Sequence, residues 1–455
     1  MTIKYFRSKI RFFLYKYPKF LLLRSLIYEN LNFIFKNYIN NKLKQIKIQK
    51  GIINKKNKKK ILLLTDQIKP GGSERQLLRL ANNLVRKNYD VLIVNLVLYE
   101  KDWLKKLNFF RSQIPNRIKI KTINLSNFNN KEIEHQINLI YKKKFPNFSK
   151  QKFLALFNNY EKILFFKFYE ILKEFKPYVV HSFLEFPNII NGICSLSIGV
   201  KRIILSTRNV PPFNFIWHKY YFKDIYKFLL QNKNILLVNN SKKGAQDYDK
   251  WLNLKNKTAK VTYNIFDFNN KWKINKIKNK NKIIVGMVAR LSPEKNINYF
   301  IEIASLLIKE SKNYHFKLYG EGYLKKSLNE KIENLGLQNN FSFMGIKKDI
   351  IYEMKKMDVC FLTSKHEGTP NVLLEAQSVG TPVITTNVGG TSECIVKNYS
   401  GYLINGQNLN RDLKQIKILF KKEKFFKKRN INFIRNKLKK FSSKQVMSKI
   451  FKLYD

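Results

Sequence analysis

The sequence predicts an α/β protein built from two doubly wound parallel-sheet domains that face a cleft. Short apolar runs alternate with amphipathic helical segments along most of the 455 residues. A polar, basic stretch without periodicity divides these runs into two series. We therefore expect a first domain over residues 58–270, a linker over 271–282 and a second domain over 283–430. A C-terminal helix over 431–455 is expected to return to the first domain.

Residues 1–57 form a basic, aromatic extension ahead of the first domain. The first 60 residues hold 17 Lys and Arg against a single acid, Glu29, and aromatic side chains are interleaved with them. No apolar run reaches the roughly 18 residues that a membrane-spanning helix needs, and no small-residue cleavage site follows. We expect a helical extension that lies on an anionic membrane surface. A helix packed on the protein is the alternative.

The net charge of +57 and the pI of about 10.1 are typical of a polyanion-binding protein. The chain is also rich in Asn, Ile, Lys, Phe and Tyr, whose codons are AT-rich, so we attribute much of the charge to genome composition and expect no nucleic-acid partner. The cysteines, Cys194, Cys360 and Cys394, are far apart and match no metal spacing. We expect a reduced cytoplasmic setting, no metal and no cofactor.

The first series begins with a buried-strand pattern, ILLLT, at residues 61–65. Gly71 and Gly72 then predict a tight turn, and Ser73 with Gln76 predicts a capping box for the following helix. A glycine turn at a helix N-terminus suits an anion or a closely approaching ligand. Further strands are expected at 91–97, 178–183, 202–207 and 235–240, and the insert over 101–176 is expected to be mostly helical.

The second series follows the linker with the same alternation. Strands are expected at 283–289, 315–319, 341–345 and 358–364, with helices at 298–310, 324–336 and 349–357 between them. Two such domains bind ligands beyond the carboxyl ends of their strands. The loop after residue 364 is therefore a candidate binding loop.

That loop opens the stretch SKHEGTPNVLLEAQSVGTPVITT, which runs from residue 364 to residue 386. Thr369 is expected to be the N-cap of a short helix and Pro370 its first residue. The helix should cover 371–379, with Gly380 at its C-terminal cap.

The same stretch offers two kinds of ligand group. Amides of Asn371 and Val372 at the helix start suit a phosphate. The carboxylates of Glu367 and Glu375 suit sugar hydroxyls. This combination fits a nucleotide sugar, although a strand–loop–helix with two solvated glutamates fits the stretch as well. Arg290 and Lys295 decide between these interpretations, because they follow the strand at 283–289 and reach the same edge of the sheet.

At this point residues 284–403 resemble the C-terminal domain of the retaining, nucleotide-sugar-dependent glycosyltransferases of family 4, which have the GT-B fold and are of the "glycosyl transferases group 1" type. The resemblance rests on ARLSPEKN, YGEGYLKKSL, LGLQNNFSFMG, DVCFLTSKHEGTPNVLLEAQSVGTPVITTNVGGTSECI and SGYLI. The N-terminal half matches less tightly, through PGGSERQLLRLANNL, VVHSF, VNNSKKG and VTYNIFD. The resemblance covers roughly residues 60 to 455.

The resemblance implies a role for each candidate residue. Arg290 and Lys295 would hold the donor diphosphate, Glu367 would contact the transferred sugar, and Glu375 would contact the ribose. Gly368, Thr369, Pro370, Asn371 and Val372 would surround the donor phosphates. Gly71, Gly72, His181, Arg208 and Asn209 would lie on the acceptor side.

The implied activity is transfer of a hexose-type sugar from a nucleoside-diphosphate sugar, with retention of configuration and without a metal. The acceptor would be a glycan or a lipid-linked glycan in bacterial cell-surface polysaccharide or lipopolysaccharide synthesis. The protein would be cytoplasmic and peripheral to the inner face of the membrane.

The chain departs from the family pattern at three places. Ala289 and Asn296 stand where relatives carry glycines, and both replacements look tolerable. Many relatives have a histidine in the loop after the strand at 202–207. Here that loop carries Arg208 and Asn209 instead, which puts a histidine-assisted role in doubt. His181 could face the cleft or could be a packed core residue.

Other functions were weighed against this one. Gly320 and Gly322 lack the third glycine of a dinucleotide-binding turn. Asp247 and Asp249 have the spacing of a metal-dependent transferase motif but lie in a lysine-rich helical stretch that suits a solvated face. A catalytically inactive transferase scaffold that binds a polyanion or a membrane is the main alternative, and the intact basic and acidic candidates argue against it.

Overall fold

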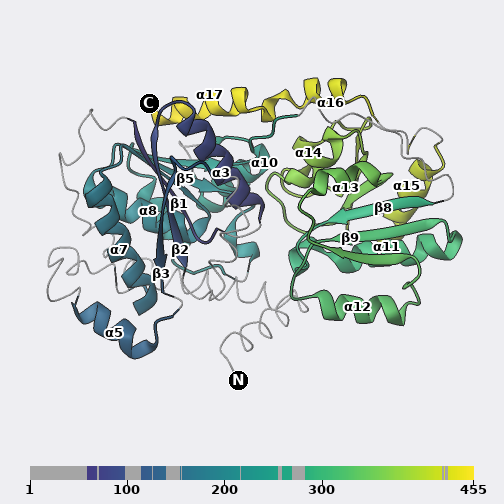
Figure 1. The fold of residues 1–455 in the computed structure, drawn as a ribbon, viewed down its shortest axis with the longest axis horizontal. Helices are drawn as coiled ribbons and strands as arrows, with labels where there is room; N and C mark the ends of the chain where they lie inside the picture. The colour runs from purple at the N-terminus through teal and green to yellow at the C-terminus, as the bar shows by residue number, and fades with distance from the viewer. Residues whose placement is uncertain are drawn as a thin grey trace. The chain divides into compact units, whose positions relative to one another are not determined.

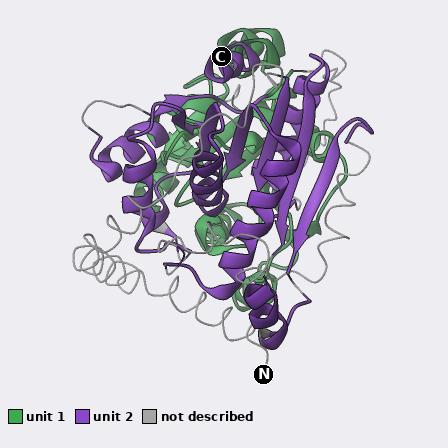
Figure 2. Cartoon of the chain, turned by 90° about the vertical axis from the view of Figure 1, so that its left-hand side faces the viewer, with its two compact units in different colours: residues 1–15, 241–243, 266–445 green, residues 16–240, 244–265, 446–455 purple. Residues whose placement is uncertain are grey.

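The structure is a computed structural model that describes residues 59–68, 71–97, 114–125, 127–139, 154, 156–215, 217–254, 259–268, 282–422, 425 and 429–455. The predictions for residues 1–57 and for the linker up to residue 281 lie outside these ranges. The described residues divide into two compact units (Figure 2). The first-sheet unit holds those from 59 to 240, 244 to 265 and 446 to 455. The second-sheet unit holds 241–243 and those from 266 to 445.

The first-sheet unit contains a seven-stranded parallel sheet in the order β3-β2-β1-β4-β5-β6-β7. Its strands are β1 (Lys60–Thr65), β2 (Asp90–Val97), β3 (Lys119–Asn124), β4 (Val179–Phe183), β5 (Arg202–Thr207), β6 (Ile235–Asn239) and β7 (Lys260–Val261). The strand order reverses direction between β1 and β4. The predicted doubly wound sheet is thereby confirmed.

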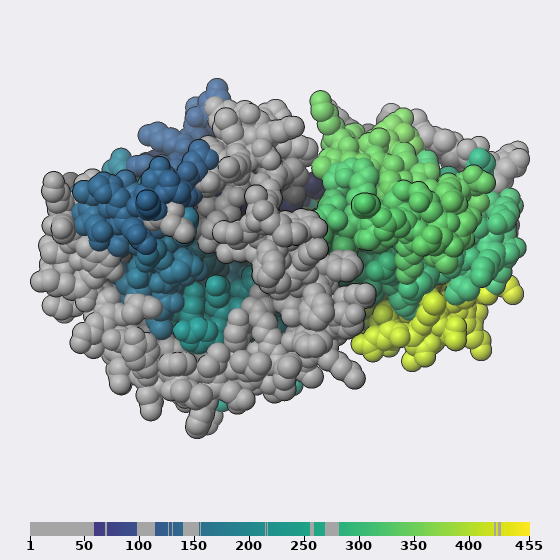
Figure 3. All heavy atoms as spheres, turned by 90° about the horizontal axis from the view of Figure 1, so that it is seen from below, coloured from purple at the N-terminus to yellow at the C-terminus, as the bar shows by residue number. Residues whose placement is uncertain are grey.

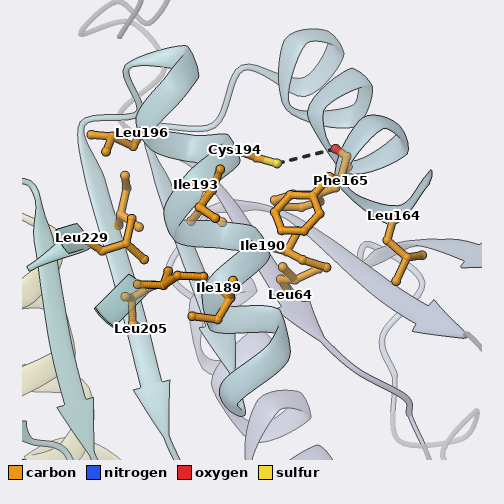
Figure 4. Packing of buried hydrophobic residues seen from close by; sticks show 14 of the residues in the cluster. Leu64, Leu164, Phe165, Ile189, Ile190, Ile193, Cys194, Leu196, Leu205 and Leu229 are labelled. Atoms are coloured by element: carbon orange, nitrogen blue, oxygen red, sulfur yellow. Dashed lines mark hydrogen bonds between the residues drawn. The ribbon is translucent and has the colours of Figure 1, made fainter. Parts of the chain in front are cut away.

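Helices of this unit are α3 (Gly72–Val85), α5 (Asn130–Leu139), α7 (Asn159–Phe175), α8 (Glu185–Ile198), α9 (Phe222–Leu229) and α10 (Lys242–Leu252), of which α10 starts in the other unit. Helix α8 lies between α7 and α9 and is buried along its whole length. Figure 4 shows its Ile189, Ile190 and Ile193 in the core beside Leu64 and Leu205. The thiol of Cys194 donates to the backbone oxygen of Phe165 at 3.5 Å (Figure 4), and all three cysteines are free and buried.

The predicted capping box at the start of α3 is wrong. The N-cap is Gly71, with φ −165°, and no side chain caps the helix. Gln76 instead exchanges two hydrogen bonds with the backbone of Ile265, at 3.1 Å and 2.6 Å. The backbone of Gly71 is extended, a conformation that any residue can adopt. The loop before α3 therefore does not depend on the tight glycine turn that was predicted.

The insert over 101–176 is not only helical in its described part. It contributes β3 as the edge strand beside β2, paired from Lys119↔Leu92 to Asn124↔Val97. Its sequence, KIKTIN, alternates polar and apolar residues, and Ile123 is its one buried residue. It therefore lacks the continuous apolar run by which β1, the first strand of the sheet, was predicted. The final part of the insert is α7, which begins with a capping box formed by Asn158 and Glu161.

The second-sheet unit contains a six-stranded parallel sheet in the order β10-β9-β8-β11-β12-β13. Its strands are β8 (Ile283–Val288), β9 (Tyr314–Tyr319), β10 (Phe341–Gly345), β11 (Val359–Leu362), β12 (Val383–Thr386) and β13 (Gly401–Ile404). Its α-helices are α11 (Ile297–Glu310), α12 (Lys325–Asn334), α13 (Ile350–Lys356), α14 (Asn371–Ser378), α15 (Leu409–Phe420) and α16 (Ile431–Lys437).

Helices α11 and α12 lie on one side of this sheet and α13 and α14 on the other (Figure 1). Helix α12 faces the viewer in Figure 3 and buries only Leu328 and Ile332. The helices were predicted from an amphipathic pattern, and it is their apolar face that covers the sheet.

The last helix, α17 (Ser443–Tyr454), begins in the second-sheet unit, and its residues from 446 onward belong to the first-sheet unit. There Phe451 stacks on Tyr89, with ring centroids 5.8 Å apart, and the Tyr454 hydroxyl lies 2.8 Å from Nδ1 of His181. No helix in the described part of the chain is long and apolar enough to cross a membrane.

Candidate functional site

The candidate donor site lies in the second-sheet unit, where β8 and β11 run side by side. From β8 the chain continues through β9 to β10 on one side, and β11, β12 and β13 follow on the other. The loops at the carboxyl ends of β8 and β11 therefore start from the point where the strand order reverses, which is where open α/β sheets bind ligands. Arg290 and Lys295 lie in the first of these loops and Glu367 lies in the second.

An ion pair joins the two loops. Nζ of Lys295 lies 2.5 Å from Oε1 of Glu367, and the same oxygen accepts a hydrogen bond from the Ser364 hydroxyl at 2.7 Å. The Glu367 residue is 7% exposed. A nearly buried carboxylate is thus held by one charged and one neutral donor, both on the same oxygen.

The backbone reinforces this contact between the loops. The N–H of Lys365 donates to the oxygen of Glu294 at 2.8 Å, and the Thr363 hydroxyl donates to the oxygen of Asn296 at 3.1 Å. Lys295 ends a 3₁₀ turn, Pro293–Lys295, and Asn296 has φ 49°, a left-handed value that asparagine tolerates well. Asn296 therefore serves at a position where a glycine would also fit.

Arg290 is exposed, and its loop is shaped by glycines of the neighbouring β9 loop. Gly320 has φ +129°, and a Cβ there would lie 2.0 Å from the oxygen of Ala289. A Cβ on Gly322 would lie 2.3 Å from the oxygen of Leu291. The two glycines thus allow the backbone on both sides of Arg290 to approach this closely. Both glycines belong to YGEGYLKKSL, but nothing in that motif indicated their contact with the Arg290 loop.

Helix α14 starts at Asn371, as predicted, and ends at Ser378, one residue earlier than predicted. Pro370 is its N-cap rather than its first residue, with φ −73° and ψ 111°, and Thr369 precedes the helix without capping it. The helix runs over Asn371–Ser378 and the chain leaves it at Gly380, whose φ is 75°. Its first-turn N–H groups, including that of Val372, have no acceptors within the helix. Glu375 lies in the second turn and is 4% exposed.

The loop after β12 supports the backbone at Gly368, a contact that was not predicted from the sequence. The N–H of Gly390 donates to the oxygen of Gly368 at 3.0 Å, and a Cβ on Gly390 would lie 2.5 Å from that oxygen. The Thr386 hydroxyl donates to the oxygen of Ser364 at 2.6 Å. The repeated small residues of TTNVGGT were the available signal. Burial lowers the pKa of His366, in the same loop as Glu367, and the neighbouring Lys365 adds to that effect.

The predicted acceptor-side residues all lie in the first-sheet unit, but not in one cluster. Gly71 and Gly72 start α3, His181 lies inside β4, and Arg208 and Asn209 follow β5. His181 and Arg208 line one small cavity of about 10 Å³, together with Gln76, Leu80, Phe183, Thr262, Tyr263, Ile265 and Ile450. The structure therefore brings two of the five residues together.

Of that pair, His181 is buried and Arg208 is half-buried. His181 is 2% exposed, burial lowers its pKa to about 3, and the positive charge of Arg208 adds to the shift. Burial also lowers the pKa of Arg208 to about 9. Among the described residues, Nε2 of His181 and Nε of Arg208 are buried without a hydrogen-bond partner, and Arg208 forms no ion pair. The guanidinium is held by neutral groups, over the Phe183 ring and beside the amide oxygen of Asn264.

The two alternative motifs have structural roles where the structure describes them. Asp249 lies in α10 and accepts a hydrogen bond from the backbone N–H of Ala259 at 2.8 Å. Gly320 and Gly322 make the close contacts described above.

Comparison with known proteins agrees with this geometry. Residues 268–439 match the family model of glycosyl transferases group 1. The match covers the second-sheet part of the chain and supports the coarser part of the expected resemblance, to glycosyl transferases of group 1.

Curated relatives carry names from cell-surface glycan synthesis. The chain is 32% identical over 237 residues to the Vi polysaccharide biosynthesis protein VipC/TviE of Salmonella typhi, covering 49% of this chain and 40% of that one. The alignments to four of the curated relatives, this one included, cover between 33% and 58% of the relative's length. A longer alignment, 24% identical over 87% of this chain and 98% of the relative, joins it to the Campylobacter jejuni GalNAc-alpha-(1->4)-GalNAc-alpha-(1->3)-diNAcBac-PP-undecaprenol alpha-1,4-N-acetyl-D-galactosaminyltransferase.

A solved structure establishes the fold. Anabaena Alr3699/HepE, crystallised with UDP and glucose, superimposes with a TM-score of 0.64 over 86% of this chain and 98% of its own, at 18% identity. The two parallel sheets and this likeness make the fold GT-B, as expected.

Proposed function

We propose that this protein is a retaining glycosyltransferase of family 4 that moves a hexose-type sugar from a nucleoside-diphosphate sugar to a glycan or lipid-linked acceptor. The observation that carries the proposal is the Lys295–Glu367 pair at the point where the second sheet reverses its strand order. One cation and one carboxylate there address the two parts of such a donor, the diphosphate and the sugar. The glycan-synthesis names of the curated relatives support the same reaction class.

The diphosphate is the leaving group, and its negative charge grows as the glycosidic bond breaks. Arg290 and Lys295 supply positive charge beside it, and the first-turn amides of α14, at Asn371 and Val372, supply hydrogen bonds. One charge pair at about 4 Å is worth roughly 4 kcal/mol at an effective dielectric near 20. Charge that is better matched to the departing diphosphate than to the intact donor accelerates the reaction.

Glu367 addresses the transferred sugar and Glu375 the ribose. Lys295 and Ser364 donate to Oε1 of Glu367, which leaves Oε2 available to accept from sugar hydroxyls. We expect no side-chain base. The donor phosphate takes the proton of the attacking hydroxyl, which arrives on the face that the diphosphate leaves, within an oxocarbenium-like ion pair. This route retains the anomeric configuration and differs from hydrolase chemistry with two carboxylates.

The first-sheet unit takes the acceptor, through Gly71, Gly72, His181, Arg208 and Asn209. Arg208 is the strongest of these candidates because its half-buried guanidinium is held by neutral groups, so its charge remains available for an anionic acceptor. The acceptor class that we propose is a growing bacterial surface glycan, including one carried on a lipid. Residues 1–57 would hold the protein on the inner face of the cytoplasmic membrane.

The test is a transfer assay with purified protein and a panel of nucleotide sugars. Release of the nucleoside diphosphate is followed by chromatography, and the anomeric configuration of the product is read by proton NMR. We expect one donor to be consumed, with a product of the same configuration, and Lys295→Met to reduce the rate at least tenfold. An inverted product would contradict the mechanism, and no consumption of any donor would contradict the function.

A further inference from the structure

Trp217 of the first-sheet unit presents an aromatic ring to solvent in a fixed orientation. It lies in the loop that follows β5 and is 44% exposed, while Phe213 in the same loop is 39% exposed. Single exposed aromatics are common on protein surfaces and need no explanation. The unusual feature here is how firmly the ring of Trp217 is held.

One face of the Trp217 ring is covered. It stacks on Phe215, with ring centroids 4.2 Å apart and an interplanar angle of 13°, and Phe215 is only 2% exposed. The buried ring is therefore a base on which the indole lies flat. The exposed area of Trp217 belongs to its opposite face and its edge.

The polar end of the indole is also held. The Trp217 side chain is a hydrogen-bonding neighbour of the Glu185 carboxylate and acts to lower its pKa. Glu185 is 6% exposed and accepts a hydrogen bond from the Tyr248 hydroxyl at 2.7 Å. Burial raises the pKa of Glu185, and these two neighbours partly oppose that effect. Ring stacking and this contact with Glu185 together fix both the position and the rotation of the indole.

The backbone around this arrangement is equally constrained. Leu184, the residue before Glu185, has φ 78° and ψ 164°, a region that residues other than glycine rarely occupy. Strain of this kind persists where the surrounding structure enforces it, often at ligand sites. The start of the loop after β5 is held as well. The side-chain amide of Asn239 donates to the backbone oxygen of Asn209 at 3.0 Å, and that of Asn240 donates to the backbone oxygen of Arg208 at 3.2 Å.

We propose that Trp217, in the same loop as the exposed Phe213, is a stacking platform for a pyranose ring of the acceptor glycan. A pyranose has one face made of C–H groups, which complements the flat, electron-rich face of an indole. Both aromatics belong to the loop at the carboxyl end of β5, the edge at which sheets of this type bind ligands. A ring that is already fixed loses little entropy on binding. This assignment rests on the proposed function, since it names the acceptor as a sugar.

A membrane contact is the competing explanation of an exposed tryptophan. At a bilayer surface, tryptophans sit at the headgroup level, where the indole has one apolar and one polar end. In this structure the protein's own buried Glu185 is the hydrogen-bonding neighbour of the indole, so the exposed face is apolar and the polar end is already used. That arrangement favours a flat apolar ligand face over a lipid headgroup.

The test measures binding of neutral tetrasaccharides of glucose, N-acetylglucosamine and galactose to the full-length protein by saturation-transfer NMR. No donor is needed, so a protein that binds these sugars but transfers none would contradict the proposed function and not the platform. The variants are Trp217→Ala, Trp217→Phe, which keeps an aromatic face, and Phe433→Ala, a control on another exposed aromatic (42% exposed) in the second-sheet unit.

We expect at least one tetrasaccharide to bind wild type and to bind Trp217→Ala about tenfold more weakly. Trp217→Phe should recover most of the affinity, and Phe433→Ala should match wild type. Trp217→Ala and Trp217→Phe both lose the contact with Glu185, so they should unfold at a somewhat lower temperature than wild type but remain folded at the temperature of the binding measurement. Three results would overturn the platform: binding of none of the sugars by wild type, equal binding by Trp217→Ala, or a loss of anionic-vesicle binding in Trp217→Ala without a loss of sugar binding.

Discussion

At the residue scale, Glu367 and Glu375 are both nearly buried carboxylates on the same stretch of chain, but they have different surroundings. Glu367 lies in the loop and shares an ion pair with Lys295, whereas Glu375 lies in the second turn of α14. In the proposed mechanism, Glu367 contacts the sugar, where positive charge develops, and Glu375 contacts the ribose, which does not change. The same substitution should therefore have different kinetic effects at the two positions.

Glu375→Gln should mainly raise the donor KM, because its contact is equally strong in the ground state and the transition state. Glu367→Gln should mainly lower kcat. Each effect should be about 10- to 100-fold, since a hydrogen bond to a charged group is worth about 1.5–3 kcal/mol. Calorimetry with the free nucleoside diphosphate is the check. Glu375→Gln should weaken that binding, and Glu367→Gln should leave it unchanged or tighter, because Lys295 loses its competing partner. The reverse pattern would exchange the two roles.

At the element scale, the loop that carries Arg290 depends on Gly320 in the neighbouring loop. Gly320→Ala would place a Cβ 2.0 Å from the Ala289 oxygen at φ +129°, whereas Gly336, with φ +63°, has no atom within 4 Å of an added Cβ. Gly336→Ala should cost about 1 kcal/mol of unfolding free energy, from its backbone conformation alone. Gly320→Ala should cost more and should also weaken nucleotide binding.

Urea unfolding and calorimetry on the two glycine variants separate these effects. Equal losses of stability, or intact nucleotide binding in a destabilised Gly320→Ala protein, would show that this glycine does not position the Arg290 loop.

Strand β4 and helix α17 meet at His181, whose burial makes stability depend on pH. The folded pKa is about 3 and the unfolded value is about 6.5, so the unfolded state binds the extra proton between these pH values. The free energy of unfolding should therefore fall as pH decreases from about 6.5, by up to about 1.4 kcal/mol per pH unit from this residue. His181→Gln should lose part of that slope in urea titrations between pH 7 and pH 4. An identical slope in His181→Gln would show that His181 does not cause this pH dependence. His135→Gln, at an exposed position, is the control and should keep the wild-type slope.

The elements were more predictable from sequence than the contacts between them. Continuous apolar runs marked most strands of both sheets because those strands are buried on both faces. Strand β3 was missed because an edge strand needs no such run. The capping box at Ser73 was a local rule, and it failed because Gln76 bonds instead to Ile265, far along the chain. The Lys295–Glu367 contact likewise joins residues far apart in the sequence. It depends on the two strands lying side by side, and no spacing in the sequence indicates it.

At the scale of the whole molecule, the strongest charge feature is the basic N-terminal extension over residues 1–57, which lies outside the described residues. The first 60 residues hold 17 Lys and Arg, interleaved with aromatics. We predict that deleting it abolishes co-sedimentation with anionic vesicles but leaves transfer to a soluble acceptor intact. The comparison belongs at raised salt, where the diffuse attraction of the remaining basic chain is screened. Equal sedimentation of both proteins there would contradict the prediction.

The central claim is that the second-sheet unit binds a nucleoside diphosphate through Lys295. The most direct measurement is calorimetric binding of the nucleoside, its monophosphate and its diphosphate to wild type and to Lys295→Met, for the base that wild type prefers. We predict that Lys295→Met weakens the diphosphate about 10- to 100-fold, since a charged hydrogen bond is lost, and leaves the nucleoside unchanged. An equal loss for all three ligands, or no loss for the diphosphate in folded Lys295→Met, would contradict the account.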